Sequence, residues 1–131
     1  MTIFESAVSI DKPVQVVYGF LADMNNHQQL MPDNIVDWSS TTDGVSFTIQ
    51  NISSLSLKIV SRMENEEIKM EPSSNPPFDM ELKWILQQTG DVTEARFTIV
   101  AELNMMMKMF AAGPLQTLVD HETQTLREIL N

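Results

Sequence analysis

One carboxyl side chain falls on a face of the sequence pattern that is otherwise apolar. If residues 114–130 form a helix with ~100° between neighbours, Glu122 projects at ~340° relative to Leu115. It then lies between Leu118 at ~300° and Leu126 at ~20°, inside the apolar sector. A carboxylate taken out of water has a raised pKa or must find a donor. Glu122 is therefore the candidate catalytic acid or base and the candidate polar ligand contact, unless water or a basic or hydroxyl group across the sheet satisfies it.

The two histidines form no pattern that indicates a metal or a nucleophile. His27 lies between two expected helical segments, and His121 falls at the edge of the apolar sector of the last helix. The two are far apart in sequence, and neither has metal-ligand spacing with another His. Asp120, His121 and Glu122 are consecutive, and consecutive helical residues do not face each other. The sequence also has no Gly-x-Ser-x-Gly motif and no glycine-rich phosphate loop, so we expect no metal, no cofactor and no catalytic triad.

Methionine is the second unusual feature. Ten residues are Met, and four of them, Met105, Met106, Met107 and Met109, crowd together just before the dipeptide at 113–114, which is Gly-Pro. On one continuous helix these four point in different directions, so some must face something other than a simple core. Three interpretations stay open. The cluster is a flexible gate beside a cavity with the Gly-Pro dipeptide as its hinge, a surface for a partner protein, or packing against the first helix and the sheet end.

Composition narrows the classes of partner. The chain has 131 residues, 43% of them hydrophobic, with 8 Lys and Arg against 18 Asp and Glu, which gives a net charge of −10. The length predicts one domain over residues 1–131, and the charge argues against nucleic acids and anionic membranes. The absence of Cys excludes disulfides and thiol chemistry. Without a signal-like leader or an apolar run of ~20 residues, we expect a cytoplasmic protein with no stable membrane insertion.

The hydrophobic period predicts the elements that position these side chains. Residues 2–10 alternate as a strand, and after Asp11, the expected N-cap, an amphipathic helix over 14–24 follows. One more helical turn is expected over 27–30. Six further segments alternate as strands, and a proline-rich loop is expected over 73–77; the strands are 35–40, 45–51, 55–59, 68–71, 78–86 and 97–103.

The end of the chain is predicted to be helical. Asn104 is the expected cap of a helix over 105–112, and Gly113-Pro114 then kinks or breaks it before a longer helix over 114–130. Seven strands with short connections and one polar face predict an antiparallel sheet with a single buried side. That side needs a cover, and the long C-terminal helix is the element available. The pattern therefore predicts the α+β class.

Several runs in this order resemble the SRPBCC superfamily, the START-like, pollen-allergen-like helix-grip domains. The runs are residues 8–13 leading into 14–24, then 30–32, 77–84 and 101–109, and the likeness covers the whole chain. The last two runs look like a subgroup of small bacterial single-domain members without an established function. The resemblance implies a strongly curved, seven-stranded antiparallel sheet wrapped around the long C-terminal helix, with two short helices after the first strand closing one end.

Domains of this superfamily keep a cavity for a hydrophobic ligand between helix and sheet, such as a lipid, sterol or polyketide. The resemblance thus implies a set of ligand contacts on the strands and the last helix: Phe47, Leu57, Met80, Leu82, Trp84, Phe97, Ile99, Met106, Met109, Leu118 and Glu122.

Three functions follow from these observations. The first is binding of a hydrophobic or amphipathic small molecule, lipid- or polyketide-like, with Glu122 orienting it. The second is a cyclase- or dehydratase-type enzyme, as some members are, with Glu122 as its acid or base. The third is a protein-interaction module of the chaperone-activator type that uses the methionine cluster or the acidic surface. Binding is favoured over catalysis because no catalytic signature transfers from the subgroup.

Overall fold

The computed structural model describes residues 1–74 and 76–131, so Asn75 of the predicted loop over 73–77 lies outside the described residues. The elements follow one another as β1 (Thr2–Ile10), α1 (Val14–Leu21), the 3-10 helix η1 (Met24–Leu30), β2 (Ile35–Ser40), β3 (Gly44–Ile49), β4 (Ser53–Met63), β5 (Glu67–Pro72), β6 (Met80–Thr89), β7 (Val92–Ala101) and α2 (Met105–Leu130).

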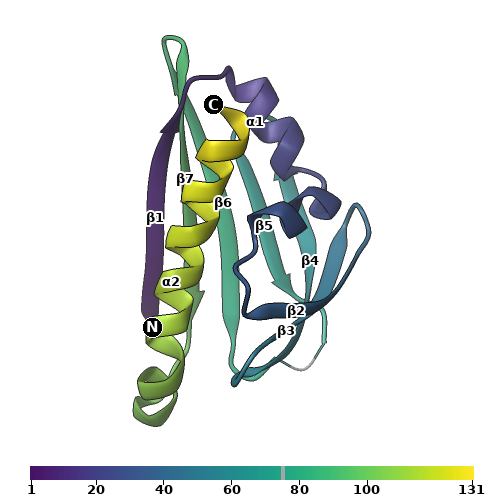
Figure 1. Ribbon diagram of the computed structural model, residues 1–131, viewed down its shortest axis with the longest axis vertical. Helices are drawn as coiled ribbons and strands as arrows, with labels where there is room; N and C mark the ends of the chain where they lie inside the picture. The colour runs from purple at the N-terminus through teal and green to yellow at the C-terminus, as the bar shows by residue number, and fades with distance from the viewer. Residues whose placement is uncertain (75) are drawn as a thin grey trace.

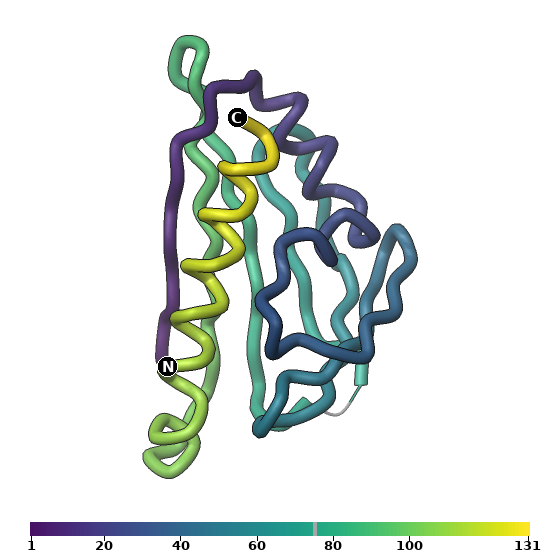
Figure 2. The backbone as a smooth tube through the Cα atoms, in the orientation of Figure 1, coloured from purple at the N-terminus to yellow at the C-terminus, as the bar shows by residue number. Residues whose placement is uncertain are grey.

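The seven strands form one antiparallel sheet in the order β1-β7-β6-β5-β4-β3-β2. The first strand therefore lies beside the last, with Phe4 opposite Ile99. The sheet curls around α2, which contacts β1 and β7, while α1 contacts β6 and β7 and η1 contacts β2 and β3 (Figures 1 and 2). This architecture confirms the predicted α+β helix-grip fold with its curved sheet, long C-terminal helix and two short helices after the first strand.

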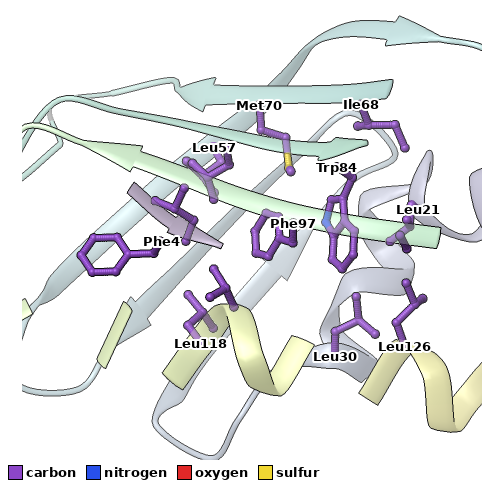
Figure 3. Close-up of a cluster of buried hydrophobic side chains, with 14 of the residues drawn as sticks. Phe4, Leu21, Leu30, Leu57, Ile68, Met70, Trp84, Phe97, Leu118 and Leu126 are labelled. Atoms are coloured by element: carbon purple, nitrogen blue, oxygen red, sulfur yellow. The ribbon is translucent and has the colours of Figure 1, made fainter. Parts of the chain in front are cut away.

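Strand alternation places the core on the inner face of the sheet. Trp84 of β6 and Phe97 of β7 pair across the strands and stack with ring centroids 4.6 Å apart and an interplanar angle of 6°. Figure 3 shows these rings facing Leu118 and Leu126 of α2 and Leu30 of η1. A central stack of this size removes much apolar surface from water, which is the main stabilising term of the fold.

The C-terminal helix is one continuous element, so of the two predicted effects of Gly113-Pro114 the break is wrong, and a kink stays a prediction. Pro114 has no N–H to donate to the carbonyl of Phe110, and a proline inside a helix costs stability for that reason. Ala111 and Leu115 are buried on the two sides of the proline and hold both halves on the same core. Tertiary packing thus outweighs the local penalty.

The first helix is shorter than predicted. It ends at Leu21, and Asp23 caps the following 3-10 helix by accepting a hydrogen bond from the N–H of Asn25 at 2.9 Å. The prediction that Asp11 caps α1 is also wrong, because the N-cap position is Pro13 and no side chain caps it.

Distant side chains replace the missing local cap. The N–H of Val14 donates to Oε1 of Gln88 at 2.8 Å, and the N–H of Asp11 donates to Oδ1 of Asn131 at 2.9 Å. These contacts join the start of α1 to the end of β6 and to the end of α2. The entry of the helix is therefore fixed by partners that no local sequence rule contains.

Arg62 ties the end of α1 to the turn between β2 and β3. Its Nε and Nη2 donate to the carbonyl of Ala22 at 3.0 and 2.8 Å, and Nη2 also donates to the carbonyl of Thr42 at 3.1 Å. The same guanidinium pairs with Asp43 at 2.8 Å. The N–H of Met24 donates to that Thr42 carbonyl as well, at 3.1 Å. Arg62 thus anchors the segment that leads into η1.

Arg62→Ala should loosen this segment. The substitution removes three donated hydrogen bonds from a charged group, and we expect it to lower the free energy of unfolding by about 2 kcal/mol in urea titrations. The amides of η1 should also exchange faster with solvent. Arg96→Ala is the matched control: Arg96 pairs only with exposed Glu5 and Glu94, so its loss should cost less than about 1 kcal/mol. Unchanged η1 exchange in Arg62→Ala would contradict the anchoring role.

Candidate functional site

A narrow, partly open cavity of about 20 Å³ lies between the inner face of the sheet, η1 and α2. This volume is enough for about one water molecule. Its walls are apolar or aromatic except for two titratable side chains, and the lining residues are Met24, His27, Met31, Trp38, Val45, Phe47, Leu57, Met70, Leu82, Phe97, Leu118 and Glu122. The cavity thus brings one carboxyl and one imidazole into an otherwise apolar space.

Glu122 is buried, as its place in the apolar sector predicted, with 3% of its surface exposed. It lies on α2 one turn from Leu118 and one turn from Leu126, which are both buried. Burial raises the pKa of the Glu122 carboxyl well above its ordinary value of 4.5. Within the described residues, no hydrogen bond or ion pair of this carboxyl group offsets that effect. The group therefore stays neutral to a higher pH than an exposed glutamate does and offers an O–H donor.

The next residue shows how a buried polar group is satisfied on the same helix. Thr123 is fully buried, and its hydroxyl donates to the carbonyl of Val119 at 3.0 Å and lies 2.8 Å from the hydroxyl of Ser6 on β1. Thr123 faces β1, whereas Glu122 faces the cavity. Thr123 is therefore satisfied between α2 and β1, whereas Glu122 lies at the cavity; among the described residues, the buried polar side-chain atom without a hydrogen-bond partner is Nε1 of Trp84.

His27 is the second titratable group, and only 2% of its surface is exposed. Its Nε2 lies 2.8 Å from the carbonyl oxygen of Leu21. Because a carbonyl only accepts, Nε2 carries the proton and Nδ1 is an acceptor in the neutral ring. Burial lowers the pKa of His27 below its ordinary value of 6.5, against the smaller opposing effects of the Leu21 carbonyl and Asp23. The neutral ring is therefore the favoured form.

The sequence pattern did not predict that His27 lines a cavity. The pattern that could have indicated the burial of His27 is a spacing of three residues, since Met24, His27 and Leu30 are the buried residues of the 3-10 helix. A search for the α-helical period of 3.6 residues does not detect this face. Trp38 also lines the cavity, and its ring stacks on Phe47 with centroids 5.7 Å apart.

Two consecutive hydrogen bonds, a polar relay, join β2 to η1, and these two elements form one wall of the cavity. Nε1 of Trp38 donates to the Ser40 hydroxyl at 3.1 Å, and that hydroxyl donates to Oδ1 of Asn25 at 2.8 Å. A bulge precedes Ser39, with Asp37 at a φ of 56°, which is a strained region for a residue other than glycine. The wall is thus held by few contacts and by an irregular strand.

The predicted ligand contacts divide into three groups. Six of them line the cavity together: Phe47, Leu57, Leu82, Phe97, Leu118 and Glu122.

The others lie elsewhere. Trp84 and Ile99 are buried in the same core and do not line the cavity. Met80 lines a separate surface hollow beside Asp79, and Met106 and Met109 are exposed on the first turns of α2. Alternation and helical period identify which residues face inward, but the position along an element decides which of them meet.

No group of three side chains suited to a metal ion occurs in the part of the chain that the structure describes. In the same residues no helix is both long enough and apolar enough to cross a membrane.

Comparison with known proteins identifies the class of fold. No family model and no curated protein matches the sequence. Solved structures match across nearly the whole chain at low identity. A START superfamily protein from Mycobacterium smegmatis is 14% identical with a TM-score of 0.70, over 97% of this chain and 98% of that one. The Aha1 dimer from Colwellia psychrerythraea is 15% identical with a TM-score of 0.72, over 99% and 96%.

A third structure is larger than this chain. The di-domain ARO/CYC BexL from the BE-7585A biosynthetic pathway is 16% identical with a TM-score of 0.73, and the match covers 98% of this chain and 46% of that one. The chain therefore has the SRPBCC-type, START-like helix-grip fold that its sequence resembles. At these identities the likeness defines the fold, and the site must be argued from its own residues.

Glu122→Gln should remove a pH-dependent loss of stability. Because the folded pKa of Glu122 is raised, the wild-type protein loses stability as pH rises from 4.5 towards that raised value, since ionisation is easier in the unfolded chain. The neutral amide has no such loss. The difference in unfolding free energy between the two proteins should therefore grow in favour of the variant as the pH rises from 4.5 towards the raised folded pKa of Glu122, measured by urea denaturation.

His27 acts in the opposite sense and cancels in this comparison. Its folded pKa is lowered, so its contribution to stability is lost as pH falls below 6.5, equally in both proteins. Glu128→Gln on the exposed side of the same helix is the control and should leave the pH profile unchanged. Parallel profiles for wild type and Glu122→Gln would show that the carboxyl is satisfied.

Proposed function

We propose that this protein binds a small, largely apolar, neutral molecule in the cavity between the sheet and α2, with Glu122 recognising its polar atom. The observation that carries the proposal is the buried carboxyl of Glu122, which lines an otherwise largely apolar cavity. A leucine there would fill space at no desolvation cost, so the carboxyl lowers the stability of the empty protein. Such groups are typical of functional sites.

The lining specifies the chemistry of the ligand. No Lys or Arg belongs to the cavity wall in residues 1–74 and 76–131, so a carboxylate or phosphate on the ligand would be buried without a cation. A neutral carbonyl or hydroxyl oxygen can instead accept from protonated Glu122. A lipid- or polyketide-like molecule with one or two oxygens and an apolar body meets both conditions.

Ligand binding requires the cavity to widen. Pockets for drug-sized ligands hold about 300–1,000 Å³, far more than this cavity has in the structure. Met24, Met31 and Met70 line it, and methionine changes rotamer at low cost. The wall of η1 and β2 is the part that we propose moves, because β2 is an edge strand of the sheet and its pairing with β3 is irregular between Val36 and Ser39. The proposal therefore includes displacement of this wall by the ligand.

A binding experiment with a matched ligand series tests the proposal. The neutral fluorophore N-phenyl-1-naphthylamine should report on the cavity, and 2-decanone and 1-decanol should displace it and raise the Tm. Decanoate, with the same chain length, should do so much more weakly at neutral pH. Glu122→Leu should raise the Tm of the empty protein and weaken 2-decanone binding by about tenfold.

Met109→Glu, on the exposed first turns of α2, is the matched control and should bind like the wild type. The proposal fails if neither neutral ligand raises the Tm of the wild-type protein. It also fails if Glu122→Leu binds 2-decanone as tightly as the wild type does.

A second candidate is a cyclase- or dehydratase-type enzyme. The observation that favours it is that Glu122 and His27 line the same cavity as a neutral acid and a neutral base. Such a pair can donate one proton and accept another without a metal. Among the structural neighbours, the ARO/CYC protein of a biosynthetic pathway is consistent with this candidate.

Glu122→Gln separates the two candidates. The amide still donates a hydrogen bond, so ligand binding survives under both, but it cannot transfer a proton. If the protein is an enzyme, turnover of a poly-β-ketone substrate should fall by at least about a hundredfold with binding intact, measured by mass spectrometry of the product. Equal turnover by wild type and variant would remove Glu122 from the role of acid or base.

A further inference from the structure

The first turns of α2 carry a surface that the proposed cavity does not use. Met105, Met106, Met109 and Phe110 are 83%, 69%, 80% and 68% exposed, and we call these four residues the methionine tip. Met105 and Met109 lie one turn apart, as do Met106 and Phe110, so they form two adjacent apolar rows. Figure 1 shows these turns, in green, extending beyond the N-terminal end of β1. Exposed apolar clusters of this kind mark interaction sites.

A groove runs beside the methionine tip. A hollow of about 510 Å³ shares Pro77, Phe78 and Met107 with a second hollow of about 340 Å³, which Phe110 also lines. The first hollow shares Asp79 and Glu102 with a third of about 300 Å³. The three hollows therefore adjoin one another through shared residues, and we call them together the base groove. None of its residues lines the cavity between sheet and helix.

The base groove is acidic along one side. Asp79, Glu81 and Glu102 line it, and in the described part of the chain no Lys or Arg does. The N–H of Glu102 donates to the carbonyl of Asp79 at 2.9 Å, which holds these two residues side by side. Glu81 pairs with Lys69 and Lys83, whereas Asp79 and Glu102 form no ion pair within residues 1–74 and 76–131.

We propose that the base groove and the methionine tip dock a basic amphipathic helix of a partner protein. The apolar face of such a helix would lie on Phe78, Met107 and the tip, where methionine adapts to irregular side chains. Its Lys and Arg residues would meet Asp79 and Glu102. An apolar floor with acidic residues along one side is the surface complementary to that pattern.

Two other occupants fit the charges less well. A second copy of this chain offers 8 basic against 18 acidic residues, and its amphipathic helix α1 contains no basic residue at all. An anionic membrane would be repelled by the carboxylates of the groove and by the net charge of −10. The complementary partner is therefore a basic peptide segment.

Peptide binding measured by fluorescence anisotropy tests the proposal on the full chain. The probes are a labelled amphipathic peptide of Lys and Leu, its scrambled version, and the same pattern with Glu in place of Lys. The Lys–Leu helix should bind, more weakly as salt is added, and the other two should not. The double variant Met109→Ser, Phe110→Ser should weaken binding by at least about tenfold, and so should Asp79→Lys, Glu102→Lys.

The control for charge is Glu64→Lys, Glu128→Lys, which changes the net charge equally at exposed sites outside the groove. It should keep most of the affinity. Circular dichroism and N-phenyl-1-naphthylamine binding check that each variant folds, so failure here is distinct from failure at the cavity.

Three outcomes would overturn the proposal. The first is an equal loss of affinity in the groove and control charge variants. The second is pelleting of the protein with phosphatidylcholine vesicles through the methionine tip. The third is self-association in sedimentation that the Met109, Phe110 variant abolishes.

Discussion

A single helix has to cover the apolar face of seven strands. Strands lie about 4.8 Å apart, so a flat sheet of this size would be about 30 Å wide, whereas a helix with its side chains is about 10 Å across. The sheet resolves the mismatch by curling, and the β1–β7 pairing places α2 over one part of the inner face. The short helices α1 and η1 take the other part (Figure 2).

The candidate site follows from this division of the cover. Where α2 and η1 meet over the sheet, neither helix fills the space completely, and the cavity lies at that seam with Glu122 on one side and His27 on the other. The site thus lies between α2 and η1, the two helices that meet over the sheet, and neither helix forms it alone. Movement of η1 changes the cavity without disturbing the pairing of β1, β7 and α2.

Periodicity was enough to predict the strands, the long helix and the burial of Glu122. Each of these depends on residues close in sequence, so local spacing contains the information. The continuous helix through Pro114 could not be predicted in this way, because Ala111 and Leu115 hold it through contacts with the distant core. The same holds for the start of α1, where Gln88 and Asn131 replace a local cap.

The candidate site was predictable only in part. Whether a side chain faces inward depends on local spacing, so the sequence pattern identified six of the residues that line the cavity: Phe47, Leu57, Leu82, Phe97, Leu118 and Glu122. Membership of the cavity also depends on how far along the strand a residue lies, which excluded Trp84 and Ile99 from the lining, and on the 3-10 geometry that turns His27 inward. The size of the cavity depends on how all these side chains pack together, and no spacing rule specifies it.

The pairing of the first strand with the last has a consequence for how the chain folds. Ser6 and Thr123 meet although they are 117 positions apart in the sequence, so the closing contacts of the sheet and helix have very high contact order. During synthesis β1 is made first and cannot pair until β7 has been made, whereas β2 to β6 can already form hairpins with their neighbours. Its apolar side chains at Phe4, Val8 and Ile10 stay uncovered for that interval. The nascent chain is therefore most exposed to aggregation just before its last helix arrives.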